Sequence, residues 1–273
     1  MQSGDFVFRG HSDHSWKICS TLQRHTIMPH QSWDDDIDDM LLHFMVNLRS
    51  IGQFPEEIAR DRRARLEYGR HHGVPSPLID FSLSPYVALF FAFNGVRPDK
   101  KEPDAQVVVY ALDIGALGLA WARLHGADHQ KEYDCFMYER EPLFEHGYPG
   151  DTLKFIRFPA SWNRRMQRQR GVFIYDTLDY RRRGLGGFEE FLGTQKEPHG
   201  SSSAASPILT KILVPASEAG DAFSRLELMA VSATHLYDSH DGAAADVVNS
   251  YSYNRKTGYA WDILLPPPDD TKM

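Results

Sequence analysis

The feature that most constrains the fold is the apolar segment Tyr86–Asn94, which follows Ser84-Pro85. Ser can cap the free amides of a helix and Pro suits its first position, so the segment is predicted to be helical. It is apolar on nearly all sides, and such a helix must be buried. It is far shorter than the roughly 20 residues of a membrane span. We therefore predict a helix packed inside a globular domain, and no membrane segment.

Segments rich in β-branched and aromatic residues predict strands around this helix. They are Asp5–Arg9, Leu78–Phe81, Val107–Leu112, Gly171–Tyr175 and Ile208–Val214. Apolar residues at helical spacing over 37–48, behind a run of Asp residues, predict a helix, and Glu56–His71 is predicted to form a mostly exposed one. This order of elements predicts a single mixed α+β domain, which we place at residues 1–249, before a polar tail over 250–273.

Charge and cysteine content narrow the class of function. The chain of 273 residues has a net charge of -7, which argues against a generic nucleic-acid binder. Its two cysteines, Cys19 and Cys135, indicate a reducing compartment. The first residues lack the features of a signal peptide, so a cytoplasmic location is expected. The basic run Arg164–Arg170 is either solvated surface or a surface that faces an anionic ligand.

Arg9 ends the first predicted strand and directly precedes Gly10. A planar guanidinium suits a phosphate or a carboxylate, and Gly10 would let a ligand approach the backbone closely. In the alternative interpretation, Arg9 is the structural partner of a buried Asp80. The residues themselves favour neither interpretation over the other.

Other chemistries have weaker support in the sequence. His71, His72 and Asp80, with His11 or His14, could form the site of a metal-dependent hydrolase. Their spacing matches no known ligand motif, so no bound metal is expected. The two cysteines lack the sequence context of a catalytic thiol. The chain also has no Gly-x-Ser-x-Gly elbow, P-loop or Gly-x-Gly-x-x-Gly fingerprint.

Three ordered blocks, within roughly residues 6 to 245, resemble the FRG domains, a bacterial family named for a Phe-Arg-Gly motif. The blocks are Phe8–Trp16, Arg70–Ser82 followed by Ser84-Pro85, and Arg165–Phe173 with Gln169 and Gly171. Arg70 and Phe81 stand where the family usually has Gln and Trp. The resemblance implies a ligand site built from these blocks. Its ligand-binding residues would be Gly10, His11, His71, Gly73, Asp80, Ser84 and Arg165.

A weaker resemblance connects Phe8-Arg9-Gly10 and Ser82-Leu83-Ser84 with ADP-ribosyltransferases of the Arg-Ser-Glu type. It implies an ADP-ribosyltransferase-like domain that uses NAD to modify a protein or nucleic-acid acceptor. The catalytic residues would be Arg9, Ser82 and Gln169. The alternative is a nucleotide or nucleic-acid binding module that has the same pocket without the reaction.

The position of the usual catalytic Glu is the main departure from those enzymes. The segment Ile212–Pro215 resembles the strand that follows this Glu, but Leu209, Thr210 and Lys211 precede it here. Gln169 could supply hydrogen bonds without the negative charge that stabilises a cationic transition state. Three carboxylates are candidate replacements: Glu189, Glu190 and Glu218.

Overall fold

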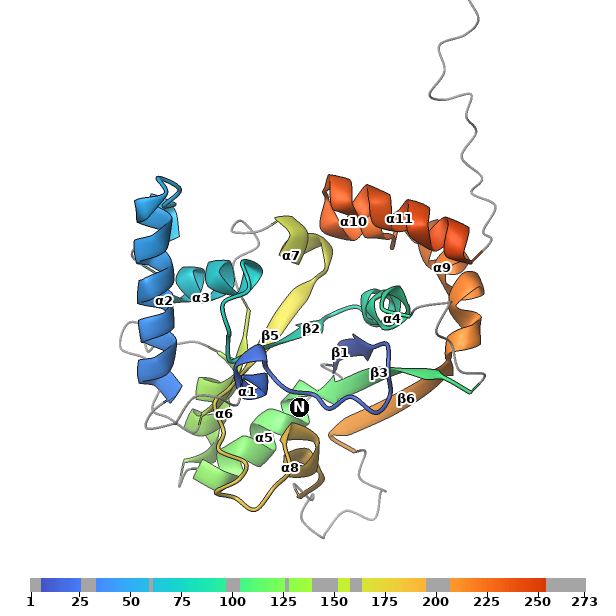
Figure 1. The fold of residues 1–273 in the computed structure, drawn as a ribbon. Coiled ribbons are helices and arrows are strands. Elements are labelled where there is room, and N and C mark those ends of the chain that lie inside the picture. Colours follow the sequence, from blue (N-terminus) through green and yellow to red (C-terminus); the bar gives the residue numbers. More distant parts are fainter. Residues whose placement is uncertain are drawn as a thin grey trace, which may run out of the picture.

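The fold is built around an antiparallel sheet. The structure, a computed structural model, describes residues 6–25, 33–58, 61–96, 104–125, 128–138, 152–157, 164–194 and 207–253. Within these residues six strands pair in the order β4-β5-β2-β1-β3-β6 (Figure 1). Their bounds are β1 Phe6–His11, β2 Leu78–Ser82, β3 Gln106–Asp113, β4 Leu153–Ile156, β5 Gly171–Asp176 and β6 Leu209–Pro215. The predicted α+β class is confirmed. The sequence did not predict β4, because its four residues are too few to show a strand pattern.

Helices cover both faces of the sheet. Their bounds are α1 Thr21–Arg24, α2 Trp33–Ser50, α3 Arg62–His71, α4 Pro85–Asn94, α5 Ile114–His125, α6 His129–Met137, α7 Arg164–Arg168, α8 Phe188–Thr194, α9 Ala219–Leu228, α10 Ala233–Tyr237 and α11 His240–Ser252, with 3-10 turns at Glu56–Ile58 and Ala216–Glu218. Helices α5, α6 and α8 lie on one face, and α3, α4, α7 and α10 lie on the other (Figure 1).

Side chains alternate between two cores along the strands, as the two-residue period of a strand requires. In β3, Val108 and Tyr110 face the core under α5, α6 and α8, whereas Val107 and Val109 pack with α4 and α9. On the second face the core is divided. One cluster lies under α4, α9 and α10, and another lies between β2, β4, β5 and helices α1, α2, α3 and α7. The boundary between these clusters lies where β1 meets β2.

Strands β1 and β2 are joined only briefly. All of β1, from Phe6 to His11, is in register with β3. Against β2, the pairing among the described residues is limited to Phe8 opposite Ser82. Backbone groups of the two strands that are not paired across this split need other hydrogen-bond partners. The split therefore creates room for side chains at the centre of the sheet.

Helix α4 confirms the predicted buried helix. Ser84 Oγ accepts a hydrogen bond from the Val87 amide, and Phe90 has no exposed surface. Gly10 lies inside β1 beneath this helix, and a Cβ there would collide with the Ala88 carbonyl oxygen. The expectation that this strand ends at Arg9 was wrong, because β1 continues to His11. The missing side chain of Gly10 makes room for the α4 backbone.

Two further expectations have a mixed outcome. The helix predicted over 37–48 is confirmed as part of α2. Helix α3 was expected to be mostly exposed, but Leu66 and Glu67 are buried because α2 and the sheet pack against it. The tail boundary at residue 249 stays a prediction. Helix α11 runs to Ser252, and residues 254–273 lie outside the described part of the chain.

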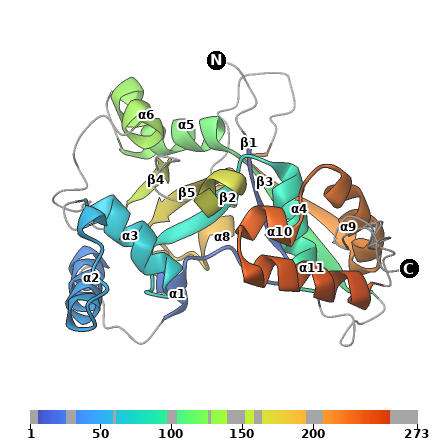
Figure 2. The ribbon, with the colours of Figure 1, turned by 90° about the horizontal axis from the view of Figure 1, so that it is seen from above.

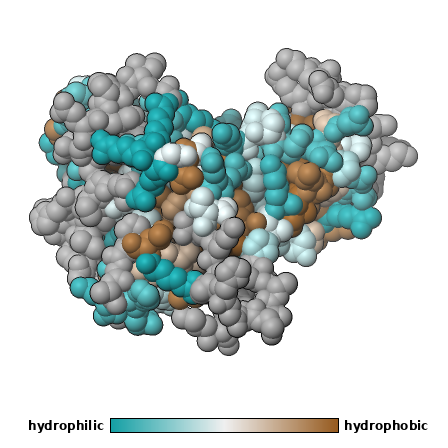
Figure 3. Space-filling model, turned by 90° about the horizontal axis from the view of Figure 1, so that it is seen from below, coloured by the Kyte–Doolittle hydropathy of each residue, from teal (hydrophilic) through white to brown (hydrophobic). Residues whose placement is uncertain are grey.

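Strand β6 forms one edge of the sheet and is largely exposed, including Ile212 and Leu213. Seen from below, the described apolar residues form separate patches among polar ones rather than one continuous surface (Figure 3). None of the helices in the described ranges combines the length and apolar character needed to cross a bilayer.

Candidate functional site

A cavity of about 810 Å³ lies over the split between β1 and β2. Residues of α3, α4 and α7 contribute to its walls. Figure 2 shows α3 and α4 on opposite sides of β2. The predicted catalytic residues Arg9, Ser82 and Gln169 all line it, although they are far apart in the sequence. Strand pairing explains their proximity, because Ser82 is opposite Phe8 on β1 and opposite Gly171 on β5.

Most of the predicted ligand-binding residues also line this cavity. They are Gly10, His11, His71, Asp80 and Arg165. The other two, Gly73 and Ser84, are not among the described lining residues. Gly73 has a φ of 87° in the turn after α3, a backbone conformation that favours glycine. Ser84 caps α4. Their local roles are therefore in the backbone that frames the cavity.

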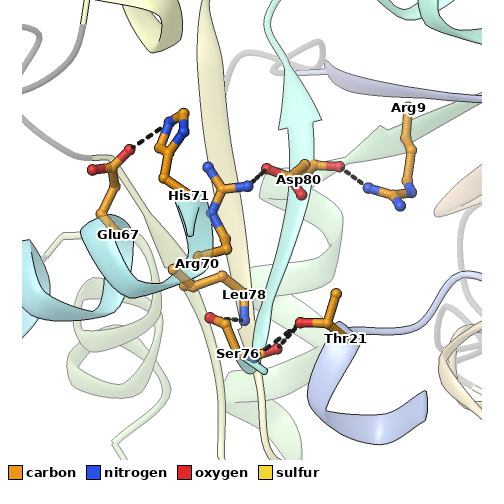
Figure 4. A network of polar contacts seen from close by, with 8 residues as sticks. All are labelled: Arg9, Thr21, Glu67, Arg70, His71, Ser76, Leu78 and Asp80. Carbon is orange, nitrogen blue, oxygen red and sulfur yellow. Dashed lines mark hydrogen bonds and ion pairs between the residues drawn. The ribbon is translucent and has the colours of Figure 1, made fainter. Parts of the chain in front are cut away.

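Arg9 crosses the split (Figure 4). Its Nη1 donates a hydrogen bond to the Asp80 carbonyl oxygen at 2.6 Å, and its Nε donates to His11 Nε2 at 2.7 Å. Among the described residues no hydrogen-bond partner of Nη2 is found. The alternative was that Arg9 pairs with a buried Asp80. Arg9 does bond to the Asp80 backbone carbonyl, but the Asp80 side chain is exposed and its carboxylate has another partner. One edge of the guanidinium is fixed by the protein and the other remains available.

The neutral imidazole of His11 orients the Arg9 guanidinium. Its Nδ1 lies 3.3 Å from the Trp16 carbonyl oxygen, which can only accept, so the proton is assigned to Nδ1 and Nε2 accepts from Arg9. Burial, followed by the charge of Arg9, lowers the pKa of His11 to about 4. At neutral pH the Nε2 lone pair is therefore engaged by Arg9. This makes His11 a poor metal ligand or general base.

The Asp80 carboxylate is paired with Arg70, the residue that replaces the usual Gln. Arg70 Nη1 lies 2.7 Å from Asp80 Oδ1 (Figure 4). The Arg70 guanidinium lies over the Phe173 ring, 4.8 Å from the ring centroid. The Asp80 side chain is 53% exposed, so the carboxylate stays accessible from the cavity. On the same helix end, His71 pairs with the buried Glu67 at 3.2 Å.

Ser82 and Gln169 form hydrogen bonds that connect the segments around the cavity. Ser82 Oγ donates to the Gln169 carbonyl oxygen at 2.7 Å and accepts from the Ser84 amide at 3.0 Å. The Gln169 side chain donates from Nε2 to the Leu236 carbonyl oxygen at 3.2 Å, at the end of α10. These bonds connect the start of α4, the turn before β5 and α10. Both side chains therefore hold the shape of the cavity.

The predicted basic run is bound to α10. Arg165 lies over the Tyr237 ring at 4.4 Å. Arg168 donates to the His235 carbonyl oxygen at 3.2 Å and pairs with Asp238 at 3.1 Å. Arg165 lines the cavity, whereas Arg168 is not among its described lining residues. Much of this charge thus stabilises the contact between α7 and α10.

The cavity is strongly cationic, in contrast with the chain as a whole. Its described lining has five Lys and Arg side chains and one carboxylate, that of Asp80. The cations are Arg9, Lys17, Arg24, Arg70 and Arg165. Burial lowers the pKa of Arg9 from its usual value, Asp80 opposes this, and Arg24 and Arg70 add to it. An arginine remains charged even so, and an anionic ligand would relieve the repulsion.

The residues at this split also carry the family likeness. Residues 4–101 match the family model of the FRG domain. The match spans β1 to α4, so the segment that matches the FRG model contributes Arg9, Arg70, Asp80 and Ser82 to the cavity. Gln169 and Arg165 come from beyond it. Comparison with curated proteins and with solved structures gave no match.

The other candidate carboxylates lie outside the FRG-domain match. Glu189 and Glu190 line a second cavity of about 520 Å³, which shares Lys17 and Cys19 with the first. Burial, followed by Glu189, raises the pKa of Tyr110 above its usual value. Glu218 lies at the start of α9, next to the edge strand β6, and is in neither described lining. Of the described side chains, no group of three His, Cys, Asp or Glu could hold a metal ion.

Sequence reasoning missed several lining residues within the FRG-domain match. Lys17, Cys19 and Arg24 follow the first motif block, and no pattern distinguishes Lys17 and Cys19 from surface residues. The detectable signal was the capping box of Ser20 and Gln23, which starts α1 and places Arg24 in its last turn. A helix predicted from this capping box would have placed Arg24 in its last turn, close to the first motif block.

Proposed function

We propose that the cavity binds a nucleotide through its phosphate groups and that NAD is the ligand. The observation that carries this proposal is the charge of the lining, where five cations face one carboxylate that is already paired with Arg70. Phosphates match such a set of donors better than neutral ligands do. The volume of about 810 Å³ lies within the usual range for small-molecule sites.

Arg9 is the proposed phosphate clamp. Its Nε and Nη1 are held by His11 and by the Asp80 carbonyl, which fixes the plane of the guanidinium before a ligand arrives. A preorganised group loses less conformational entropy on binding. The remaining donors can then form charge-assisted hydrogen bonds to an oxyanion.

The binding proposal can be tested by calorimetric titration of NAD and ADP-ribose. Arg70→Gln removes a cation and leaves the Asp80 carboxylate without its partner. We expect NAD to bind about 10- to 100-fold more weakly, the effect of losing a hydrogen bond to a charged group. Arg225→Gln is the matched control, because Arg225 is exposed and pairs with Asp221 on α9. Absence of NAD and ADP-ribose binding by the wild type, or equal affinity in Arg70→Gln, contradicts the proposal.

ADP-ribosyl transfer is the second candidate function, and the accessible Asp80 carboxylate favours it. In this reaction the bond between ribose and nicotinamide breaks and nicotinamide leaves. A nucleophile of the acceptor then bonds to the ribose carbon and loses its proton. Positive charge develops on the ribose, and a carboxylate in the same cavity as Arg9 can stabilise it.

Transfer is tested with labelled NAD and separate protein, DNA and RNA acceptors. We expect label on one acceptor class with the wild type, and none with Asp80→Asn. That variant should still bind NAD, because it removes negative charge from a cationic cavity. Label transferred equally well by Asp80→Asn would reject the role of this carboxylate. Binding without any transfer would leave the module as a nucleotide-binding domain.

A further inference from the structure

Trp16 combines a fixed backbone with an exposed ring beside the proposed phosphate site. Its amide donates to the Asp13 carbonyl oxygen at 3.2 Å. Its own carbonyl oxygen accepts from Tyr110 Oη at 3.2 Å and lies 3.3 Å from His11 Nδ1. The residue is nevertheless 56% exposed. Hydrogen bonds fix the main chain of Trp16, while its side chain is exposed to solvent.

The exposed Trp16 lies in the same cavity as Arg9. A single exposed apolar residue is common on protein surfaces. Trp16, however, lines the same cavity as the cationic cluster. His11 contacts both residues, since its Nε2 accepts from Arg9 and its Nδ1 faces the Trp16 carbonyl. The guanidinium and the Trp16 backbone thus lie on opposite edges of one imidazole.

The indole also has room for a partner. Among the described residues its ring contact is with His11, at a centroid distance of 6.3 Å and a tilt of 57°. This is at the long end of aromatic pairing, and more than half of the Trp16 surface is exposed. Lys17, the next residue, also lines the cavity and adds to its positive charge.

We propose that Trp16 is the stacking platform for the aromatic base of the bound nucleotide, whose phosphates lie at Arg9. This inference rests on the proposed function and narrows the ligand class to phosphates that carry a planar base. Base stacking on an aromatic side chain tolerates different bases, because every base has a π face. Trp16 would therefore favour a nucleotide over a phosphate compound that has no base.

The test compares two variants and two ligands by calorimetry. Trp16→Leu removes the aromatic face and Trp16→Phe retains a smaller one. ADP-ribose carries a base, and pyrophosphate does not. We expect Trp16→Leu to bind ADP-ribose about 5- to 150-fold more weakly, with Trp16→Phe in between. Affinity for pyrophosphate should be unchanged in both variants.

Two further arms complete the experiment. Tyr86→Leu is the matched control, because Tyr86 is 51% exposed and is not among the described lining residues. It should bind both ligands as the wild type does. AMP and nicotinamide mononucleotide, titrated separately, identify which base of NAD depends on Trp16.

The outcomes separate this inference from the proposed function. Unchanged ADP-ribose affinity in Trp16→Leu overturns the stacking role and leaves nucleotide binding intact. Equal losses for ADP-ribose and pyrophosphate also overturn it, because they mean that Arg9 and His11 have been displaced. A wild type that binds neither ligand overturns both proposals together.

Discussion

Replacing Arg9 with Lys separates the two roles that the structure gives this side chain. Arg9 donates from Nε to His11 and from Nη1 to the Asp80 carbonyl, and its Nη2 has no partner among the described residues. A Lys keeps the positive charge but cannot make both bonds in that geometry or present a planar fork. The substitution should therefore weaken both the fold and the ligand site.

The size of each effect follows from the contacts. At least one hydrogen bond from a charged donor is lost at the split, which costs about 1.5–3 kcal/mol of folding free energy. For a chain of this size each 1 kcal/mol lowers the melting temperature by about 2–4 °C, so a decrease of about 3–12 °C is expected. Loss of one charge-assisted bond to phosphate should weaken NAD binding about 10- to 100-fold.

Thermal unfolding and NAD titration are measured on the same samples. Arg168→Lys is the matched control, because Arg168 also donates to a backbone carbonyl and is not among the described lining residues. We expect Arg168→Lys to lower the melting temperature without changing NAD affinity. Arg9→Lys should lower both. A large loss of stability in Arg9→Lys with wild-type NAD affinity would refute the clamp and leave Arg9 a structural residue.

Three further substitutions test the surroundings of the cavity. Gly10→Ala should destabilise the fold by about 3 kcal/mol or more, measured by urea unfolding, because its Cβ meets the α4 backbone. Gly193→Ala, which meets nothing within 4 Å, should not. The pKa of His11 is about 4 in the folded chain, whereas the ordinary value is 6.5. Between pH 4 and pH 6.5, His11 therefore takes up a proton when the chain unfolds. Stability should therefore fall as pH drops through this window, by up to about 1.4 kcal/mol per pH unit. His11→Gln should lose that part of the urea-unfolding pH profile, and an unaltered profile contradicts the assignment. Asp80→Asn should change stability by about 1 kcal/mol or less, because the Asp80 side chain is half exposed. A loss of several kcal/mol in the same assay would show a larger structural role.

Local sequence determined the elements that frame the site. Ser84-Pro85 and the apolar residues after it specify α4 without tertiary information, because capping and burial on all sides are properties of the segment itself. The strand patterns likewise identified β1, β2, β3, β5 and β6. Phe8-Arg9-Gly10 and the block ending at Ser82 indicated the likeness to the FRG domain, because residue types and spacing can be read from the sequence alone.

Only the tertiary structure decided what these residues contact. Placing β1 beside β2 with one described register pair opens the split that Arg9 crosses, and strand order is set by long-range packing that no local pattern encodes. The same packing made Gly10 necessary for the close approach of α4 as well as part of the cavity lining, and it paired the Asp80 carboxylate with Arg70. It also brought Trp16 into the cavity, because a residue in an irregular segment has no periodicity from which its neighbours can be predicted.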